Sequence, residues 1–363
     1  MAKLGDYTYI KTGKLDANAS SDNGRYPFFT CSKESLLIDT YSYDCECVLV
    51  AGNGDLNVKY YLGKFDAYQR TYIIESNNKE KLLVRYLYYF LDKYVETLRE
   101  QSIGGVIKYI KLGNLTEAYI PLPSLDEQRK IAAVLDKVSD LIAKRKQQLD
   151  KLDELVKSRF IEMFGDVIRN SKAWQMRVFE DVAASRLGKM LDAKQQTGKY
   201  SYPYLANFNV QWFRFNIENL NQMDFDEDDR AEFELKDGDL LVCEGGEIGR
   251  CAVWHNEIQP CFFQKALHRV RCNRQIIHPD YLAWWFKYNC DYDGFTAIAG
   301  SKATIAHLPG IKLKQLQVAV PPIELQEQFA TFVEQTDKSK LAIQKSLERL
   351  EILKKALMQK YFG

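Results

Sequence analysis

Apolar side chains recur every three or four residues along two stretches of the chain, residues 122–165 and 320–363. This spacing places them on one helix face and, sustained over several heptads, is typical of a coiled-coil seam. We predict two long helices, each of about 38 residues and about 57 Å long at ~1.5 Å per residue. The predicted seam comprises Ile131, Leu135, Val138, Ile142, Leu149, Leu152 and Val156 in the first helix and Phe329, Val333, Ile343, Leu347, Leu350 and Leu357 in the second.

The two stretches are copies of each other. They superpose without a gap at a constant shift of 198 residues, so that Pro123 falls on Pro321 and Gln128 on Gln326. A repeat of this length indicates that the whole chain is built from duplicated units.

Start and stop signals bound both predicted helices. Ser124 and Glu127 have the spacing of a capping box, and the prolines at 321–322 are tolerated at a first helical turn. Both stretches end in Phe-Gly, and glycine suits the left-handed position after a helix, here Gly165 and Gly363.

An isolated helix of this kind leaves its apolar stripe uncovered, so it needs a partner. We expect the two copies to pack against each other, antiparallel, within one chain. The alternative is that each packs only on its neighbouring globule. The seam is interrupted by Arg145, Arg159, Thr336, Lys340 and Lys354. Polar pairing or a partner subunit is expected at the four cationic positions.

The segments before each helix also repeat, more faintly. The segment 13–17 resembles 188–193, and Tyr68-Gln69 resembles Phe263-Gln264. Short strands bounded by glycine, asparagine and aspartate indicate mainly β units with one or two helices. The predicted fold is α+β with an internal pseudo-twofold repeat: globules at 1–121 and 166–319, separated by two long antiparallel helices at 122–165 and 320–363 that form a coiled coil.

Composition narrows the class of protein. The chain has 46% hydrophobic and 27% charged residues, a net charge of +1 and no long apolar run, which favours a soluble globular protein. The first residues lack the apolar core of a signal peptide, so we expect a cytoplasmic protein. The eight cysteines form no C-x-x-C pair and there are only four histidines, so the pattern favours reduced thiols over a metal site.

Catalytic motifs are not evident. No Gly-Lys is followed by Ser or Thr, as a phosphate-binding loop requires, and no methyltransferase or metal-nuclease pattern is present. The acidic run 224–234 fits either a cation site or a solvated loop, and we favour the loop. Cys243 and Cys251 near His255 fit either a nucleophile or buried thiols, and we favour buried thiols. We therefore expect a non-catalytic chain.

Cations beside aromatic residues in turn-rich segments point instead to nucleic-acid binding, because lysine and arginine hold phosphates while polar and aromatic groups contact bases. Ordinary solvated surface is the alternative for any one residue. The matched positions Lys14 and Lys189 strengthen the binding interpretation. The candidate DNA-binding residues are Lys11, Lys14, Arg25, Tyr26, Lys59, Lys108 and Lys111 in the first globule and Arg186, Lys189, Lys194, Lys199, Tyr202, Arg250 and Lys302 in the second.

With its repeats in view, the chain resembles the DNA-specificity subunits of type I restriction–modification enzymes. The resemblance is carried by the helix entries at 121–132 and 321–330, each leading to a helix that closes on Phe-Gly behind a globule. It implies that each globule reads one half of a bipartite double-stranded DNA target and that the helices set the spacing.

The resemblance also implies partners. Two modification subunits carrying S-adenosylmethionine would dock on the helices and methylate adenine, and restriction subunits would add the ATP- and Mg²⁺-dependent nuclease. No cofactor is expected in this chain, and no membrane. Two other hypotheses remain: a coiled-coil assembly protein whose globules bind other proteins, and an enzyme with an unrecognised site.

Overall fold

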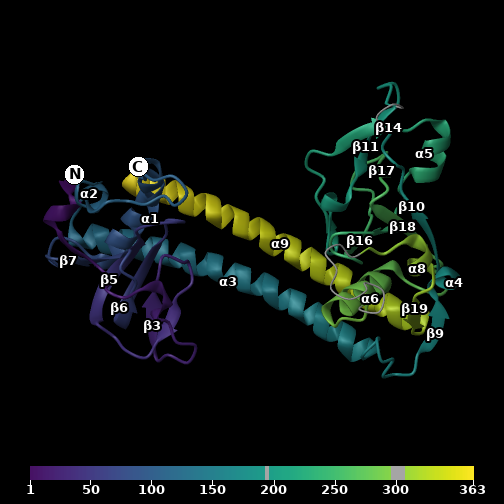
Figure 1. The fold of residues 1–363 in the computed structure, drawn as a ribbon, viewed down its shortest axis with the longest axis horizontal. Helices are drawn as coiled ribbons and strands as arrows, with labels where there is room; N and C mark the ends of the chain where they lie inside the picture. Colours follow the sequence, from purple (N-terminus) through teal and green to yellow (C-terminus); the bar gives the residue numbers. More distant parts are fainter. Residues whose placement is uncertain (193–195, 296–306) are drawn as a thin grey trace. The chain divides into compact units, whose positions relative to one another are not determined.

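The computed structural model describes residues 1–192, 196–295 and 307–363. Contacts divide the chain into two compact units (Figure 1): the first unit comprises Met1–Gln148 and Ile343–Gly363, and the second unit comprises Leu149–Ala342. The long helices α3 (Leu125–Phe164) and α9 (Ile323–Phe362) each contribute residues to both units. Within the described residues, no helix is both long and apolar enough to cross a membrane.

The first unit is built on a six-stranded sheet with the order β2-β7-β5-β6-β3-β4. Helix α1 (Val84–Gln101) covers the face formed by β5 and β6. A short ladder joins β1 (Ala2–Lys3) to β8 (Tyr119–Ile120), and α2 spans Leu112–Thr116. The sheet strands are β2 (Thr8–Thr12), β3 (Tyr26–Phe29), β4 (Leu36–Ile38), β5 (Tyr43–Ala51), β6 (Val58–Ala67) and β7 (Thr71–Ser76).

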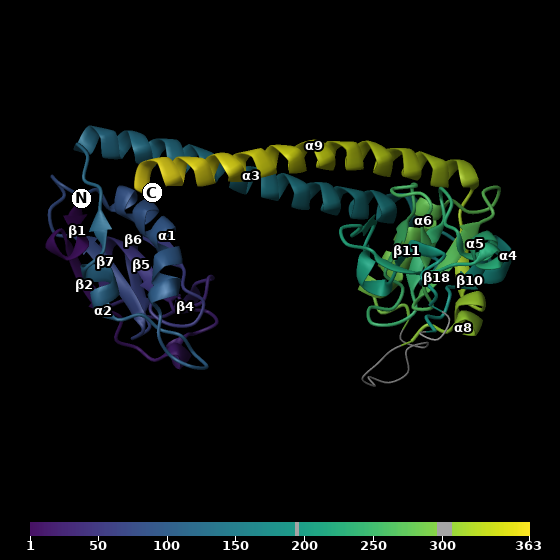
Figure 2. The same ribbon diagram turned by 90° about the horizontal axis from the view of Figure 1, so that it is seen from above.

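In the second unit, the strands that correspond to the single sheet of the first unit form two sheets, ordered β10-β18-β15-β16 and β14-β11-β17. Figure 2 shows α6 (Pro279–Asp291) beside these strands, and its most extensive contacts with a strand are with β16. Strands are β9 (Gln175–Val178), β10 (Ala183–Leu187), β11 (Ser201–Leu205), β12 (Val210–Gln211), β13 (Arg214–Phe215), β14 (Asn221–Asp224), β15 (Leu240–Cys243), β16 (Cys251–Val253), β17 (Phe262–Phe263), β18 (Leu267–Cys272) and β19 (Gln317–Val320); the remaining short helices are α4 (Phe179–Val182), α5 (Glu227–Phe233) and α8 (Gly310–Lys314).

The sheet orders show that the predicted repeat is real. β2 pairs with β7 as β10 pairs with β18, and the parallel pair β3–β6 corresponds to the parallel pair β11–β17. The main difference lies in β6, which is one continuous strand, whereas its counterpart is interrupted between β16 and β17. The α+β class with a duplicated architecture is therefore confirmed.

Two matched glycines mark a close backbone approach in each unit. A Cβ at Gly13 would lie 2.1 Å from the carbonyl oxygen of Ala67, and one at Gly188 would lie 2.4 Å from that of Gln264. Both distances are far below a normal contact, so only glycine fits without moving the chain. The sequence match between 13–17 and 188–193 therefore has a steric cause.

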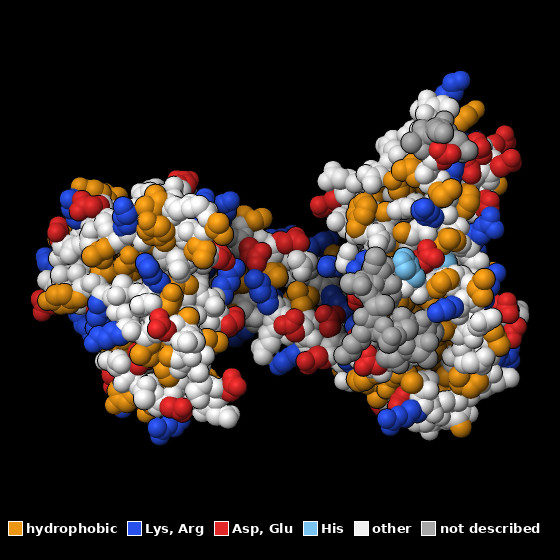
Figure 3. Space-filling view, in the orientation of Figure 1, with side chains coloured by type: hydrophobic (Ala, Val, Ile, Leu, Met, Phe, Trp, Pro, Cys, Tyr) orange, Lys and Arg blue, Asp and Glu red, His pale blue; other side chains and the backbone are white. Residues whose placement is uncertain are grey.

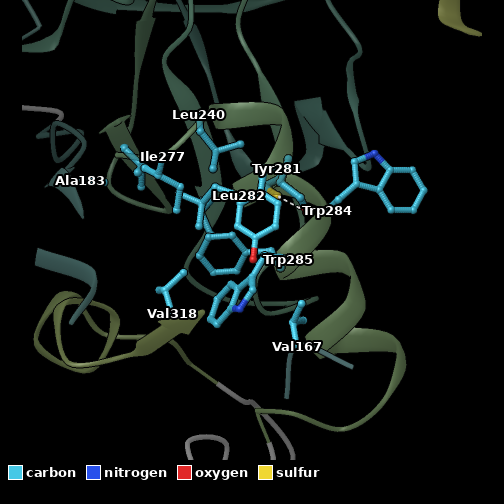
Figure 4. Close-up of a cluster of buried hydrophobic side chains, with 14 of the residues drawn as sticks. Val167, Ala183, Leu240, Ile277, Tyr281, Leu282, Trp284, Trp285 and Val318 are labelled. Carbon is cyan, nitrogen blue, oxygen red and sulfur yellow. Dashed lines mark hydrogen bonds between the residues drawn. The ribbon is translucent and has the colours of Figure 1, made fainter. Parts of the chain in front are cut away.

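Each unit has an apolar core between its sheet and its helix. In the first unit, Tyr86, Leu87 and Leu91 of α1 are buried against Val48 and Ile74. In the second, Figure 4 shows Tyr281, Leu282 and Trp285 of α6 among Leu240, Ile277 and Val318, with Trp284 directed to another side of the helix. Trp284 there stacks on Phe213 at 4.5 Å between ring centroids.

α3 and α9 run antiparallel within each unit. In the second unit, Asp153 of α3 pairs with Lys340 at 2.7 Å, and Phe160 packs edge-on against Phe329 with ring centroids 5.5 Å apart. In the first unit, Lys146 pairs with Glu351 at 3.3 Å. None of the predicted seam positions is exposed: Ile131, Leu135, Val138, Val156, Phe329 and Leu347 are buried, and Ile142, Leu149, Leu152, Val333, Ile343, Leu350 and Leu357 are half-buried.

The residues that interrupt the seam have polar or aromatic neighbours. Lys340 also approaches Asp337, and Lys354 lies 3.5 Å from Asp92 of α1. The Arg159 guanidinium lies 6.0 Å from the centre of the Phe332 ring. These contacts explain how long cationic side chains are accommodated along an otherwise apolar seam.

The helix ends largely follow the sequence signals. The Ser124 hydroxyl accepts a hydrogen bond from the Glu127 N–H at 3.3 Å, and Gly165 adopts a φ of 72° after α3. Pro321 and Pro322 were expected in the first turn of α9, but they precede it. Helix α9 begins at Ile323, and the Pro322 carbonyl accepts the N–H of Leu325.

A buried glutamine near the start of each long helix fixes the helix to its globule. The Gln128 amide accepts the N–H of Leu83, the N-cap of α1, at 3.0 Å and donates to the carbonyls of Lys81 and Pro123. Gln326 accepts the N–H of His278, the N-cap of α6, at 2.8 Å and donates to the carbonyls of Ile276 and Pro321.

Both glutamines are fully buried. Their identical networks give a structural reason for the match of Gln128 to Gln326 in the sequence. We call each network a glutamine clamp.

Candidate nucleic-acid interface

The predicted DNA-binding residues of the first unit fall into two groups: exposed side chains without an ion pair, and side chains engaged in contacts within the chain. Lys14, Lys108 and Lys111 are exposed, and no ion pair joins them to any residue in the described ranges. Lys11 pairs with Glu75 at 2.6 Å and lies over the Tyr43 ring. Lys59 donates to the Ser32 carbonyl at 2.6 Å, and burial lowers its pKa.

The predicted residues of the second unit are engaged to a greater extent. Arg186 pairs with Glu232, and Lys189 pairs with Asp229 and donates to the Asp224 carbonyl at 2.7 Å. Arg250 pairs with Glu247 at 3.2 Å, and the Tyr202 hydroxyl accepts from Arg230. Lys199 is exposed. Lys194 and Lys302 lie outside the described residues.

The acidic run 224–234 was expected to be a solvated loop, but most of it is helical. Asp226 caps helix α5, and its carboxylate accepts the Asp229 N–H at 2.9 Å. The run pairs with cations of its own unit, Arg186 and Lys189. The described residues contain no group of three or more metal-ligating side chains.

Equivalent positions therefore differ in availability. Lys14 follows β2 and Lys189 follows β10. The backbone N–H of Lys14 donates to the carbonyl of Ala67, the last residue of β6, and that of Lys189 donates to the carbonyl of Phe263, the last residue of β17. The Lys14 side chain is exposed, whereas only 14% of the Lys189 side chain is exposed. A buried, paired lysine is a poor phosphate ligand, because its charge is already neutralised within the chain.

Sequence reasoning missed a second matched pair of cations at the same turns. Arg70 follows Tyr68-Gln69, and Lys265 follows Phe263-Gln264. Both are exposed, and neither has a side-chain ion pair within the described residues. The signal was present in the sequence, since a cation follows the matched glutamine in both copies.

The first unit also has an exposed cluster of aromatic and cationic side chains. The rings of Tyr26 and Tyr41 lie 4.9 Å apart, and Lys64 lies 4.6 Å above the Tyr41 ring. Arg25 lies 5.8 Å from the centre of the Tyr26 ring. Exposed aromatic rings beside cations suit contacts with nucleic acid. Only Arg25 and Tyr26 were predicted, because Tyr41 and Lys64 come from other strands and turns.

Charge is mixed on the face of the molecule that Figure 3 shows, where lysine and arginine alternate with aspartate and glutamate. With a net charge of +1, the chain as a whole offers little electrostatic attraction to DNA, so only local groups of cations could supply it.

Cys243 and Cys251, the two cysteines considered as nucleophiles, are buried thiols. Cys243 and Cys251 lie buried in β15 and β16, and burial raises the pKa of both. Burial also raises the pKa of Cys261, Cys272 and Cys290 to about 12. A thiol that stays protonated is a weak nucleophile.

The long helices expose apolar side chains away from their seam. In the first unit these are Val134, Leu141, Ile352 and Leu353, and in the second unit they include Leu155 and Leu341, which is 56% exposed. Leu155 and Leu353 are equivalent by the 198-residue shift. Such residues along a helix are candidates for contact with another protein.

Comparison with known proteins identifies the family. The family described as type I restriction modification DNA specificity domain matches residues 1–154 and 171–353. The EcoDI specificity subunit of Escherichia coli is 39% identical over 157 residues, which are 43% of this chain and 34% of that protein. The putative specificity subunit S.HindORF215P of Haemophilus influenzae is 22% identical over 359 residues, 93% of this chain and 88% of that protein.

The match spans only about a third of the EcoDI subunit and under half of the MjaX subunit of Methanocaldococcus jannaschii, of which it covers 45%. Among solved structures, the S subunit of a type I restriction–modification system from M. genitalium superposes with a TM-score of 0.68 at 17% identity, covering 100% of this chain and 95% of that one. A chain from a study of type I assembly and conformational transition superposes with a TM-score of 0.58 at 15% identity, covering 99% and 96%.

These solved structures support the duplicated fold, and the sequence match includes both globules and most of both long helices. The chain belongs to the type I restriction modification DNA specificity family.

Proposed function

We propose that this chain is the specificity subunit of a type I restriction–modification complex and that each globule reads one half of a bipartite double-stranded DNA target. The observation that carries the proposal is the duplication: the same sheet order is built twice on two long helices in a chain of this family. Two similar but divergent readers suit a target with two different halves.

Lysine and arginine at the exposed turns would hold phosphates and set the register of each globule on the duplex. In the first unit we assign this role to Lys14, Arg70, Lys108 and Lys111, and in the second to Lys199 and Lys265. The Tyr26–Tyr41 cluster would contact bases or sugars. Lys11, Lys59, Arg186, Lys189 and Arg250 are engaged within the chain and would contribute mainly by holding strands and turns in place.

The helices would set the separation of the two half-sites. Each has 40 residues. At ~1.5 Å per residue, that is about 60 Å. One turn of DNA is about 34–36 Å. The helix length therefore suits half-sites separated by a turn or somewhat more.

The helices would also dock two modification subunits, which would carry S-adenosylmethionine and methylate an adenine flipped out of the duplex. A pseudo-twofold chain offers two similar surfaces to two identical partners. Restriction subunits with ATP and Mg²⁺ would join this complex. The chain itself would supply recognition and no catalytic group. The alternative, a coiled-coil protein whose globules bind other proteins, is not favoured, because the family match includes both globules.

The proposal is tested by sequencing that detects adenine methylation in cells carrying the chain and its modification subunit. We expect one bipartite motif with an unspecified spacer. Exchange of residues 166–319 for the corresponding globule of another specificity subunit should change one half of the motif and leave the other. A contiguous motif, or no new methylation, would overturn the proposal.

A further inference from the structure

The two units differ in a groove between the long helix and the globule, and the difference points to a partner side chain. In the first unit, Arg85 of α1 fills this position. Its guanidinium donates to Asp136 of α3 at 2.7 Å and lies 4.4 Å from the centre of the Tyr60 ring. The Tyr89 hydroxyl donates to the same carboxylate at 2.6 Å. The site is a carboxylate–guanidinium pair stacked on aromatic rings, complete within one chain.

The second unit keeps the acceptor but has no arginine at the position equivalent to Arg85. Glu334 of α9 corresponds to Asp136 by the 198-residue shift, and Asp280 of α6 corresponds to Arg85 by the 195-residue shift that relates the two helix N-caps. An acid therefore stands where the first unit has an arginine. The groove has a volume of about 710 Å³ and apolar walls at Ala330, Val333 and Leu341. Its polar lining residues are Asp280, Glu327, Glu334, Asp337, His255, His278, Thr331 and Lys338.

Among the described residues, the cations near the groove do not complete this site. Arg274 lies against the His278 ring, with 3.3 Å between Nη1 and Nε2. Glu334 pairs at 2.6 Å with Lys338 on its own helix, but both side chains are about two-thirds exposed, so that pair is weak. Asp337 has Lys340 at 3.3 Å, and Lys340 also pairs with Asp153. Asp280 has His278 Nδ1 at 3.3 Å, a ring nitrogen that already accepts the Asp280 N–H.

Electrostatics agree with an unfilled cation position. Burial raises the pKa of Asp280 to about 6, and the Asp337 and Glu334 carboxylates add to the rise while His255 and Arg274 oppose it. Burial lowers the pKa of His278 to about 4, and Arg274 adds to this, so His278 is neutral at pH 7. A cation entering the groove would stabilise the ionised form of Asp280.

We propose that the groove lined by Asp280, Glu334 and Asp337 receives an arginine side chain presented by a partner protein, in the position that Arg85 occupies in the first unit. The imidazole rings of His255 and His278 offer planar faces for the guanidinium, as the tyrosine rings do beside Arg85. Ala330, Val333 and Leu341 accept the apolar stem and a neighbouring apolar residue. Nucleic acid does not fit, since three carboxylates repel phosphate.

The inference rests on the proposed docking of modification subunits by the helices, and it adds that the two docking positions are not equivalent. One is closed by the chain's own Arg85, and the other is open to a partner's arginine. Two identical partners would therefore bind with different affinities.

The test replaces the missing cation within the chain. Asp280→Arg should let the second unit fill its own groove, as the first does. Full-length chain is titrated with its modification subunit, and stoichiometry is followed by native mass spectrometry and affinity by calorimetry. We expect wild type to bind two copies and Asp280→Arg to bind one with unchanged affinity and the other at least about tenfold more weakly, as loss of a desolvated charge pair predicts.

Two further variants distinguish an effect of the groove from a general effect of charge, and a folding control accompanies them. Glu218→Arg makes the same charge change at an exposed loop of the second unit and should bind as wild type does. Glu334→Gln with Asp337→Asn keeps the size of the groove but removes its acceptor charge, and it should weaken the same single docking event. Thermal unfolding of each free variant shows whether it is folded.

The outcomes distinguish the two proposals. If Asp280→Arg and the Glu334/Asp337 variant both bind two modification subunits with wild-type affinities, the groove inference is wrong and the proposed function stands. If the wild-type chain binds neither modification subunit nor a bipartite DNA target, the proposed function fails and the groove inference fails with it.

Discussion

The Gln128 and Gln326 amides make the same three hydrogen bonds in the two units, whereas Lys14 and Lys189, at equivalent positions, have different surroundings. The same contrast holds between Gly13 and Gly188, which share a steric role, and Arg85 and Asp280, which have opposite charges. The uncharged pairs have kept the same contacts, and the charged pairs have diverged in their surroundings or in the sign of their charge. The comparison therefore distinguishes residues that maintain the fold of both units from residues that differ between them.

The glutamine clamps give the largest expected effect. Gln128→Leu and Gln326→Leu each leave one buried N–H and two carbonyls without their partner, and we expect a loss of about 3 kcal/mol in the free energy of unfolding. Urea denaturation measures both. Gln147→Leu, on an exposed position of α3, is the control and should change stability by less than about 0.5 kcal/mol. Markedly unequal losses at the two clamps would break the equivalence of the units.

Substitution of the two matched lysines should affect different properties: protein stability for Lys189 and DNA binding for Lys14. Lys189→Ala removes the cation from a carboxylate that is only 18% exposed, and should cost about 2 kcal/mol of stability. Lys14→Ala should leave stability unchanged and weaken DNA binding. Thermal unfolding and a DNA titration on both variants test this. Equal loss of stability in the two would show that Lys14 also has a structural role.

Asp280 should make the second unit sensitive to pH. Its folded pKa of about 6 lies above the ordinary value of 3.8, so the folded chain binds the proton more tightly and stability falls as pH rises from about 4 to 6. Asp280→Asn should therefore be more stable than wild type at pH 7, by about 1–2 kcal/mol because the side chain is one-quarter exposed. Denaturation curves at pH 4 and pH 7 measure the difference. An advantage independent of pH would contradict this account.

The matched cations at the turns give the smallest effect and the finest test of the comparison. Arg70→Ala and Lys265→Ala should each weaken DNA binding and reduce the slope of log affinity against log salt by about 0.9, the value for one phosphate contact. Binding is followed by fluorescence anisotropy at several salt concentrations, with the modification subunit present. A change in one variant alone would assign the phosphate contact to a single unit.

Much of the architecture could be predicted from the sequence, because it depends on local signals. The apolar spacing of the helices, the Ser124 cap and the glycine after α3 are each legible within a few residues. The matched Gln128 and Gln326 were noticed, but their role could not be inferred, since two of the three partners of each are backbone atoms 45–50 residues away.

The candidate site was harder to predict because the availability of a cation depends on distant acids. Lys189 meets Asp229 only because the acidic run forms α5, and the capping aspartate Asp226 was a signal for that helix. Arg70 and Lys265 were overlooked although they follow a matched glutamine. Tyr41 and Lys64 join the Arg25–Tyr26 cluster through strand pairing, which spacing along the chain does not reveal.

The glutamine clamps have a consequence for how such chains change over time. Apart from the glutamine itself, every atom in a clamp belongs to the main chain, so the clamp places no demand on the side chains of the globule that it holds. Any globule that presents the start of its helix in the same way can be held. Under the proposed function, globules of unrelated surface would therefore be interchangeable on one pair of helices, and exchange of one globule would change recognition while both helices are kept.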